Sequence, residues 1–189
     1  MPGILCRIMK RISHWLVGVA ALALAACAST QDITIVHTSD PSVEEQAVRE
    51  MLDRLYVAFC FDAKEEADWE TQRALFAEGA TFVAPFRAGG TPRGVDAETF
   101  LADFRSYILT SPRGKTGYHE TITDTRIEVF GTIAHAYVLF DAFVPGAEPD
   151  ARGVDSIQLV RGPGGWLLAS FTTQYASADT PLPQRFLPR

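Results

Sequence analysis

The chain has 189 residues, of which 17 are basic and 23 are acidic, and its formal net charge is −6 at neutral pH. Hydrophobic residues make up 47% of the sequence, which is enough to bury the core of one domain of ordinary size. An acidic chain without a stripe of lysine and arginine is repelled by phosphate backbones, so we expect no nucleic-acid partner.

The N-terminal 26 residues have the layout of an export signal. Arg7, Lys10 and Arg11 form a basic leader, and residues 15–24 form an apolar run. The run is shorter than the roughly 20 residues that a membrane-spanning helix needs, which disfavours a stop-transfer helix.

The apolar run ends in Leu24-Ala25-Ala26-Cys27, which resembles the lipobox of bacterial lipoproteins. The resemblance implies that residues 1–26 are a signal peptide, that the chain is cut before Cys27 and that its thiol is acylated. An ordinary secretory signal with a chance cysteine is the alternative. Ala28, in place of an aspartate, resembles the pattern of lipoproteins sent to the outer membrane of diderm bacteria. We therefore expect a lipid-anchored protein in the cell envelope that faces the periplasm.

Residues 27–41 are predicted to hold the lipidated cysteine and a flexible tether, since residues 28–40 are polar and unpatterned. Removal of three basic residues and no acidic residue takes the net charge of the mature chain from −6 to −9. Cys60 then has no partner for an intramolecular disulfide. Its place after Tyr56 and Phe59 on a helix predicts a small buried side chain rather than a reactive thiol.

Three helices are predicted before the main sheet. The first begins at Ser42, which forms a capping-box signature with Glu45. Its apolar residues recur every three or four positions and share one face: Val48, Met51, Leu52, Leu55, Tyr56 and Phe59. A second helix is predicted over 67–76, with Gly79 as a left-handed stop.

A strand over 81–86, closed by Pro85, and a loop over 87–95 are predicted next. Asp96 then caps the third helix, whose buried face carries Phe100, Leu101, Phe104 and Ile108. Four longer strands follow, over 119–130, 133–143, 152–161 and 166–175. The folded domain therefore spans 42–176, and a proline-rich tail of residues 177–189 follows it.

This order of elements resembles the NTF2-like fold, also called the SnoaL-like or steroid-isomerase-like cone fold. Four segments carry the resemblance in the same order along the chain: residues 74–82 (ALFAEGATF), 130–135 (FGTIAH), 152–159 (RGVDSIQL) and 165–166 (GW). The resemblance implies an α+β cone with three N-terminal helices packed on a curved antiparallel sheet. Because this fold carries isomerases, dehydratases and pure binding modules, function must be argued from its cavity.

A hairpin turn at Gly131-Thr132 places Glu128 opposite His135 and Arg126 opposite Tyr137 on one face of the sheet. Since that face carries charges, the other face is predicted to be the concave one that packs against the helices. A bulge would reverse this alternation at the far end of a strand. The charged face also carries apolar side chains, so it either forms a homodimer interface or is covered by the C-terminal tail.

The predicted cavity combines apolar walls with a few polar groups, which suits a small, mostly apolar ligand. Its expected lining residues are Tyr56, Phe82, His119, Thr123, Phe140, Asp155, Thr172 and Gln174. Tyr56 resembles the isomerase tyrosine that donates to the oxyanion, and a buried tyrosine bonded to a carbonyl is the alternative. Asp155 has two interpretations. It is either a carboxylate that is hydrogen-bonded by backbone amides or by Arg152, or a general base whose pKa is raised by burial.

The residues give little support to an enzyme. Alignment of residues 80–85 on the isomerase strand puts Ala84 where the family's base belongs. Ser156 has no histidine within reach in the sequence or in the predicted ladder. His135 is expected to form a surface ion pair with Glu128. The histidines and Cys60 do not converge, so we expect no metal and no cofactor.

We therefore expect a non-catalytic domain that binds a small, mostly apolar molecule or a protein partner. The alternative is a lyase or isomerase of the same fold that uses Asp155 or His119 as general base. A scaffold lipoprotein with a collapsed cavity is a third interpretation.

Overall fold

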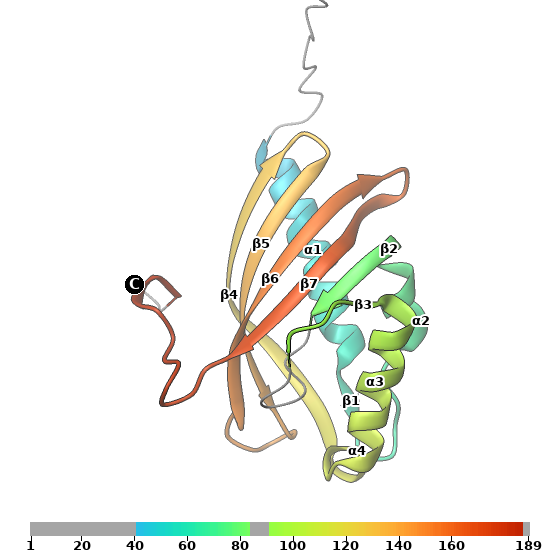
Figure 1. Ribbon diagram of the computed structural model, residues 1–189, viewed down its shortest axis with the longest axis vertical. Helices are drawn as coiled ribbons and strands as arrows, with labels where there is room; N and C mark the ends of the chain where they lie inside the picture. Colours follow the sequence, from blue (N-terminus) through green and yellow to red (C-terminus); the bar gives the residue numbers. More distant parts are fainter. Residues whose placement is uncertain (1–40, 84–90, 187–189) are drawn as a thin grey trace, which may run out of the picture. The chain divides into compact units, whose positions relative to one another are not determined.

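The computed structural model describes residues 41–83 and 91–186 (Figure 1). The predictions about the signal peptide, Cys27, the tether, Ala84 and Pro85 lie outside these residues. Within the described ranges, no helix is both long and apolar enough to cross a membrane.

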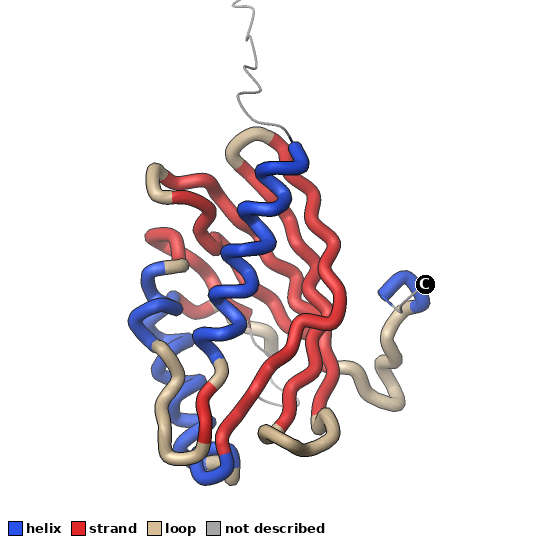
Figure 2. The backbone as a smooth tube through the Cα atoms, turned by 180° about the vertical axis from the view of Figure 1, so that it is seen from behind, coloured by secondary structure: helices blue, strands red, loops and turns tan. Residues whose placement is uncertain are grey.

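Helix α1, Pro41–Phe59, buries the face that its apolar spacing predicts. The six side chains of that face are at most 4% exposed: Val48, Met51, Leu52, Leu55, Tyr56 and Phe59. The predicted capping box is wrong, because Ser42 lies inside the first turn and Glu45 pairs with Arg49 at 3.1 Å instead. Figure 2 shows α1 running across one face of the sheet.

Helix α2, Trp69–Ala74, is shorter than predicted, and strand β2, Phe76–Val83, begins at Phe76 rather than at Thr81. Gly79 has a φ of 75°, but it lies inside β2 rather than at a helix end. The pairing of β2 shifts register at this point, between Phe76 and Thr81. The left-handed glycine therefore serves a bulge, which glycine accommodates as readily as a helix end.

Helix α3, Ala97–Thr110, is capped as predicted, since the Asp96 carboxylate accepts the Thr99 N–H at 2.7 Å. Its predicted apolar residues are all buried: Phe100, Leu101, Phe104 and Ile108. The short helix α4, Arg113–Thr116, follows it, and a 3-10 helix, Gln184–Phe186, ends the described chain.

Seven strands form one sheet in the order β1-β4-β5-β6-β7-β2-β3. The long strands are β4, Gly117–Phe130; β5, Ile133–Phe143; β6, Ala151–Gly162; and β7, Gly165–Tyr175. Strands β1, Phe61–Asp62, and β3, Val95–Asp96, are short edge pieces. The sheet is mixed rather than antiparallel throughout, because β2 runs parallel to β7.

The predicted register of the β4–β5 hairpin is confirmed. Glu128 pairs with His135 and Arg126 with Tyr137, and Arg126 and Glu128 are exposed. The inner face of the sheet, opposite these charges, carries buried side chains at alternate positions: Ala134, Ala136, Val138, Phe140, Asp155, Ile157 and Leu159. This inner face packs against α1 and defines the interior of the domain.

Two irregularities change which residues reach the inner face. Strand β4 has a register shift between Ile122 and Asp124, and β7 has one opposite the step from Gln158 to Leu159. Since side chains alternate with a period of two, one extra residue moves every later side chain to the other face. Tyr118 and Glu120 in β4 and Thr173 and Tyr175 in β7 therefore belong to the interior, as the following section describes.

A buried polar contact ties the start of α1 to the β6–β7 hairpin. Glu44 is 4% exposed, and its carboxylate accepts the Trp166 indole N–H at 3.0 Å and pairs with Arg161. A carboxylate at this depth is stable only while both donors are present.

We expect Glu44→Ala to lower the free energy of unfolding by about 2 kcal/mol, because Trp166 loses its acceptor and Arg161 its partner. The matched control is Glu45→Ala, which removes only a half-exposed pair with Arg49 and should cost about 0.5 kcal/mol or less. Urea denaturation of both variants measures the difference. Equal losses would show that the Glu44 contact contributes no more than a surface pair.

The outer face of the sheet is covered in part by the chain's own tail. Phe186 is 7% exposed; its ring lies 5.5 Å from that of Tyr137 and 5.7 Å from the Arg126 guanidinium. Phe130 and Ile133 at the hairpin tip remain 64% and 55% exposed. The tail thus covers the middle of the outer face and leaves the tip open.

Candidate functional site

Two acidic side chains lie inside the domain among tyrosines, and we define these residues as the carboxyl pair, Asp155 and Glu120. Asp155 comes from β6, directly opposite Thr173 of β7, and Glu120 comes from the part of β4 beyond its bulge. Tyr56 reaches the pair from the buried face of α1. These elements bring their polar groups into an interior that is mostly apolar.

Asp155 is 2% exposed and is bonded to Tyr56, whose hydroxyl donates to Oδ2 of the carboxyl. The other oxygen, Oδ1, is buried without a hydrogen-bond partner among the described residues. An unsatisfied carboxyl oxygen in a protein interior is costly, so a water molecule or a ligand group that donates to Oδ1 would be stabilising.

The environment of the carboxyl pair favours protonation. Burial, and after it the charge of Glu120, raise the pKa of Asp155 to about 8, against weaker lowering by the hydroxyls of Tyr56 and Thr173. Burial also raises the pKa of Glu120 to about 7, against lowering by the Tyr118 hydroxyl, which donates to its carboxylate. The two groups are coupled, so near neutral pH the pair holds at least one proton that it can give up or accept.

Aromatic rings surround the pair. The Phe140 ring is 6.2 Å from that of Tyr56 and 5.8 Å from that of Tyr175. Burial, then the charges of Glu120 and Asp155, raise the pKa of the Tyr175 hydroxyl, which keeps it neutral. Since Tyr175 and Glu120 are only partly buried, this end of the interior is reached from solvent.

Arg113 stands at the solvent-facing end of the site. Its guanidinium lies 5.8 Å from the ring centres of both Tyr107 and Tyr118 and pairs with Asp150. Its Nε is buried without a hydrogen-bond partner among the described residues. Cation–π contacts of this kind stabilise the positive charge of Arg113 beside these two rings.

Cys60 lies beside the pair, half-buried. Its Sγ lies 3.2 Å from the Tyr56 carbonyl oxygen and accepts the Glu120 N–H at 3.3 Å. Burial raises the pKa of the thiol, which keeps it protonated and unreactive.

Three of the predicted lining residues are brought together: Tyr56, Phe140 and Asp155. Phe82 is 1% exposed and packs in the aromatic core, with its ring stacked 4.3 Å from that of Phe100. The expectation that Arg152 satisfies Asp155 is wrong, because Arg152 pairs with Asp141 across the strands at 2.7 Å.

The other four predicted lining residues do not face the interior. His119 lies between the inward-facing Tyr118 and Glu120, and its Nε2 lies 3.3 Å from Asp62 Oδ1. Thr123 is the exposed residue of the β4 bulge, and Thr172 and Gln174 are exposed on β7. In both strands the prediction assumed unbroken alternation, which the bulges reverse.

Sequence reasoning missed Glu120, Tyr118, Thr173 and Tyr175. Beyond the bulge, the inward positions of β4 include two apolar residues, Tyr118 and Ile122. These residues were the one sequence signal that indicated the phase of this part of the strand. In β7, Trp166 and Leu168 suggest the opposite phase to Phe171, and the conflict itself indicates an irregularity.

His135 also differs from its prediction. Its Nε2 lies 3.1 Å from Ser156 Oγ on the outer face, so the expectation that no histidine reaches Ser156 is wrong. The two residues lie diagonally across β5 and β6. The prediction considered only directly opposite positions and therefore overlooked this contact. The structure gives His135 no hydrogen bond to a carboxylate within the described residues, so the orienting acid of a triad is not in place.

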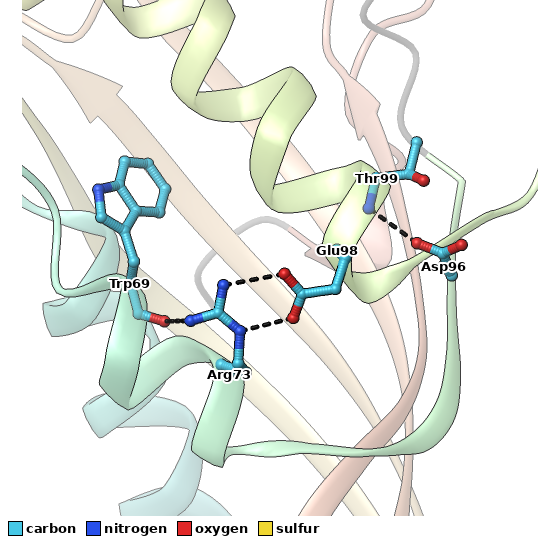
Figure 3. Close-up of polar contacts among 5 residues, drawn as sticks. All are labelled: Trp69, Arg73, Asp96, Glu98 and Thr99. Carbon is cyan, nitrogen blue, oxygen red and sulfur yellow. Dashed lines mark hydrogen bonds and ion pairs between the residues drawn. The ribbon is translucent and has the colours of Figure 1, made fainter.

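A hollow lies on the surface between α2 and α3, with a volume of about 660 Å³. The charged side chains that line this hollow are already paired. Arg73 donates to both oxygens of Glu98 at 2.5 and 2.9 Å (Figure 3), and Arg105 pairs with Glu66. No group of three or more metal-ligating side chains occurs within the ranges 41–83 and 91–186.

Comparison with solved structures identifies the architecture. A protein of unknown function from Shewanella baltica OS155, described as NTF2-like, covers 74% of this chain and 99% of its own, with 20% identity and a TM-score of 0.53. Another NTF2-like protein, from Pseudomonas putida KT2440, gives 78% and 98% coverage, 12% identity and a TM-score of 0.58. The protein has the NTF2-like fold. The S. rosetta CaMKII hub matches this NTF2-like domain as well, over 73% of the chain and 98% of its own, at 22% identity and a TM-score of 0.51.

These identities show the fold alone, because NTF2-like domains carry unrelated functions. No family model matches the sequence, and no curated protein matches it. The function of this NTF2-like domain is therefore argued from the carboxyl pair.

Proposed function

We propose that the interior of this NTF2-like domain binds a small, mostly apolar molecule whose polar group meets the carboxyl pair. The observation that carries the proposal is Oδ1 of Asp155, which is buried and has no hydrogen-bond partner within the described residues. Apolar walls with a few convergent polar groups are the usual composition of a small-molecule site. Phe140 and the tyrosines supply those walls.

The binding role is tested with the full chain in neutral detergent, screened by thermal shift against hydrophobic metabolites. A ligand at 100 times its dissociation constant stabilises the folded state by about 2.7 kcal/mol. We expect at least one class of compound to stabilise the protein, and Asp155→Asn to reduce the shift. Thr172→Ala, an exposed position on the neighbouring strand, is the matched control and should leave the shift unchanged. A library without a stabilising member would contradict the proposal.

Proton-transfer catalysis, as in a lyase or isomerase, is the second candidate, and the protonation of the carboxyl pair near neutral pH favours it. Asp155 would act as the base, whereas His119 is turned away from the pair. Turnover of a bound compound that is lost in Asp155→Ala, while the variant stays folded, would support catalysis. Bound compound recovered unchanged would support binding alone.

The sequence supports a lipid anchor on Cys27, so we propose that the domain is held at the outer membrane and faces the periplasm. Mass spectrometry of the mature N-terminus should find an acylated Cys27, and Cys27→Ser should release or misprocess the protein. An intact leader on the mature chain would refute the anchor. A homodimer through the outer face competes with the tail that holds Phe186 there, and sedimentation of the full chain distinguishes the two.

A further inference from the structure

The carboxyl pair has no basic partner among the groups that act on it. The charged group that raises the pKa of Asp155 is another acid, Glu120, and the groups that act on Glu120 are its own burial and the Tyr118 hydroxyl. Buried acids are ordinarily matched by a cation or by several donors. Here the described residues provide neutral hydroxyls instead, those of Tyr56 and Thr173 beside Asp155 and that of Tyr118 beside Glu120.

The two arginines that could serve are committed elsewhere. Arg152 donates to both oxygens of Asp141, at 2.5 and 2.7 Å. Arg113 pairs with Asp150 and lies against the rings of Tyr107 and Tyr118. The site therefore combines two acids with aromatic faces. A positively charged ligand would pair with the acids and contact the aromatic faces.

We propose that the ligand of the carboxyl pair carries a positively charged amine, as a primary to quaternary ammonium on an apolar body. The aromatic faces of Tyr56, Phe140 and Tyr175 attract such a cation, as aromatic cages attract quaternary ammonium groups. Asp155 Oδ1 would be its closest anionic contact. This inference rests on the proposed function, since it names the polar group of the molecule that the interior binds.

Binding of a cation is linked to loss of a proton from the pair. The ammonium enters, the O–H bond of one carboxyl group ionises, and its proton is taken up by the solvent; no other bond forms or breaks. Affinity for a permanent cation therefore rises with pH until the pair is ionised, whereas a neutral ligand gains nothing from ionisation. Seven other titratable or charged groups face or flank the pair from its packed elements: Tyr56, Cys60, Tyr107, Arg113, Tyr118, Asp150 and Tyr175. The hydroxyls of Tyr56, Tyr118 and Tyr175 have raised pKa values and stay neutral over this range.

The test uses two probes of the same shape, phenyltrimethylammonium and tert-butylbenzene, with the full chain in neutral detergent. At pH 8 we expect phenyltrimethylammonium to bind at least tenfold more tightly than tert-butylbenzene. Between pH 5.5 and 7 the affinity for the cation should rise by about tenfold for each pH unit. Calorimetry in buffers of different ionisation enthalpy should show release of about one proton per cation bound. The Asp155→Asn, Glu120→Gln double variant should bind both probes equally and independently of pH.

Equal affinity for the two probes at pH 8, or a cation affinity that does not change with pH in the unaltered protein, would overturn the inference. The proposed function would survive that result, because tert-butylbenzene would still be bound. Failure to bind either probe would also overturn it, and the metabolite screen would then decide the proposed function separately.

Discussion

Replacement of Asp155 by asparagine is expected to stabilise the protein at pH 8. The folded pKa of Asp155, about 8, lies above its ordinary value of 3.8, so the folded state binds a proton that the unfolded state has released. The corresponding stability is fully present below about pH 4 and is lost as the pH rises through about 8. Asparagine has no charge to bury, so the variant avoids this loss.

The expected size is on the order of 3 kcal/mol at pH 8. Each unit of pKa shift corresponds to about 1.4 kcal/mol, and part of the gain is offset because the asparagine amide group is itself buried. Glu120→Gln should have the same sign with a smaller size, because the pKa of Glu120 rises only from 4.5 to about 7. The two steps belong to a coupled pair, so the double variant should gain less than the sum.

Urea denaturation between pH 5 and pH 9 measures the effect. The unfolding free energy of the unaltered protein should fall with pH across this range, and that of Asp155→Asn should fall less steeply. Asp124→Asn is the matched control, since Asp124 is exposed on the outer side of the β4 bulge. Curves for Asp155→Asn and the unaltered protein that stay parallel would show that Asp155 ionises normally in the folded state.

The fold was predictable because its signals are periodic and local. The buried face of α1, the Asp96 cap and the β4–β5 register all follow from spacing, and all are found in the structure. The start of β2 was not predictable in this way, because Phe76 fits a helical pattern as well as a strand. Pairing with β7 decides between the two, and that contact is distant in sequence.

The candidate site was half predictable for the same reason. Tyr56 and Asp155 lie on uninterrupted periodic segments, so their inward orientation follows from alternation. Glu120 and Tyr175 lie beyond bulges, where one additional residue reverses the phase. Bulges depend on how neighbouring strands fit together, and a single strand's sequence carries little trace of them.

Replacement of Gly153 by alanine is expected to destabilise the protein and to disturb the candidate site at once. A Cβ at this position would lie 2.7 Å from the Phe140 ring and 3.0 Å from the Gln174 carbonyl oxygen. The Phe140 ring is 1% exposed and lies against Tyr56 and Tyr175, so it cannot retreat without displacing them. Overpacking against a ring that is held by its neighbours costs about 1–3 kcal/mol, and we expect a value near the upper end.

The design includes its own control and rescue. Gly164→Ala adds the same methyl group in open space in the β6–β7 turn and should change the unfolding free energy by less than about 0.5 kcal/mol. Phe140→Leu in the Gly153→Ala background should recover part of the loss, because the smaller side chain leaves room for the methyl group. If the double variant is no more stable than expected from adding the two single losses, the ring does not rest on Gly153. Since Phe140 is also a wall of the carboxyl pair, the same variants should weaken the compound shift found in the metabolite screen.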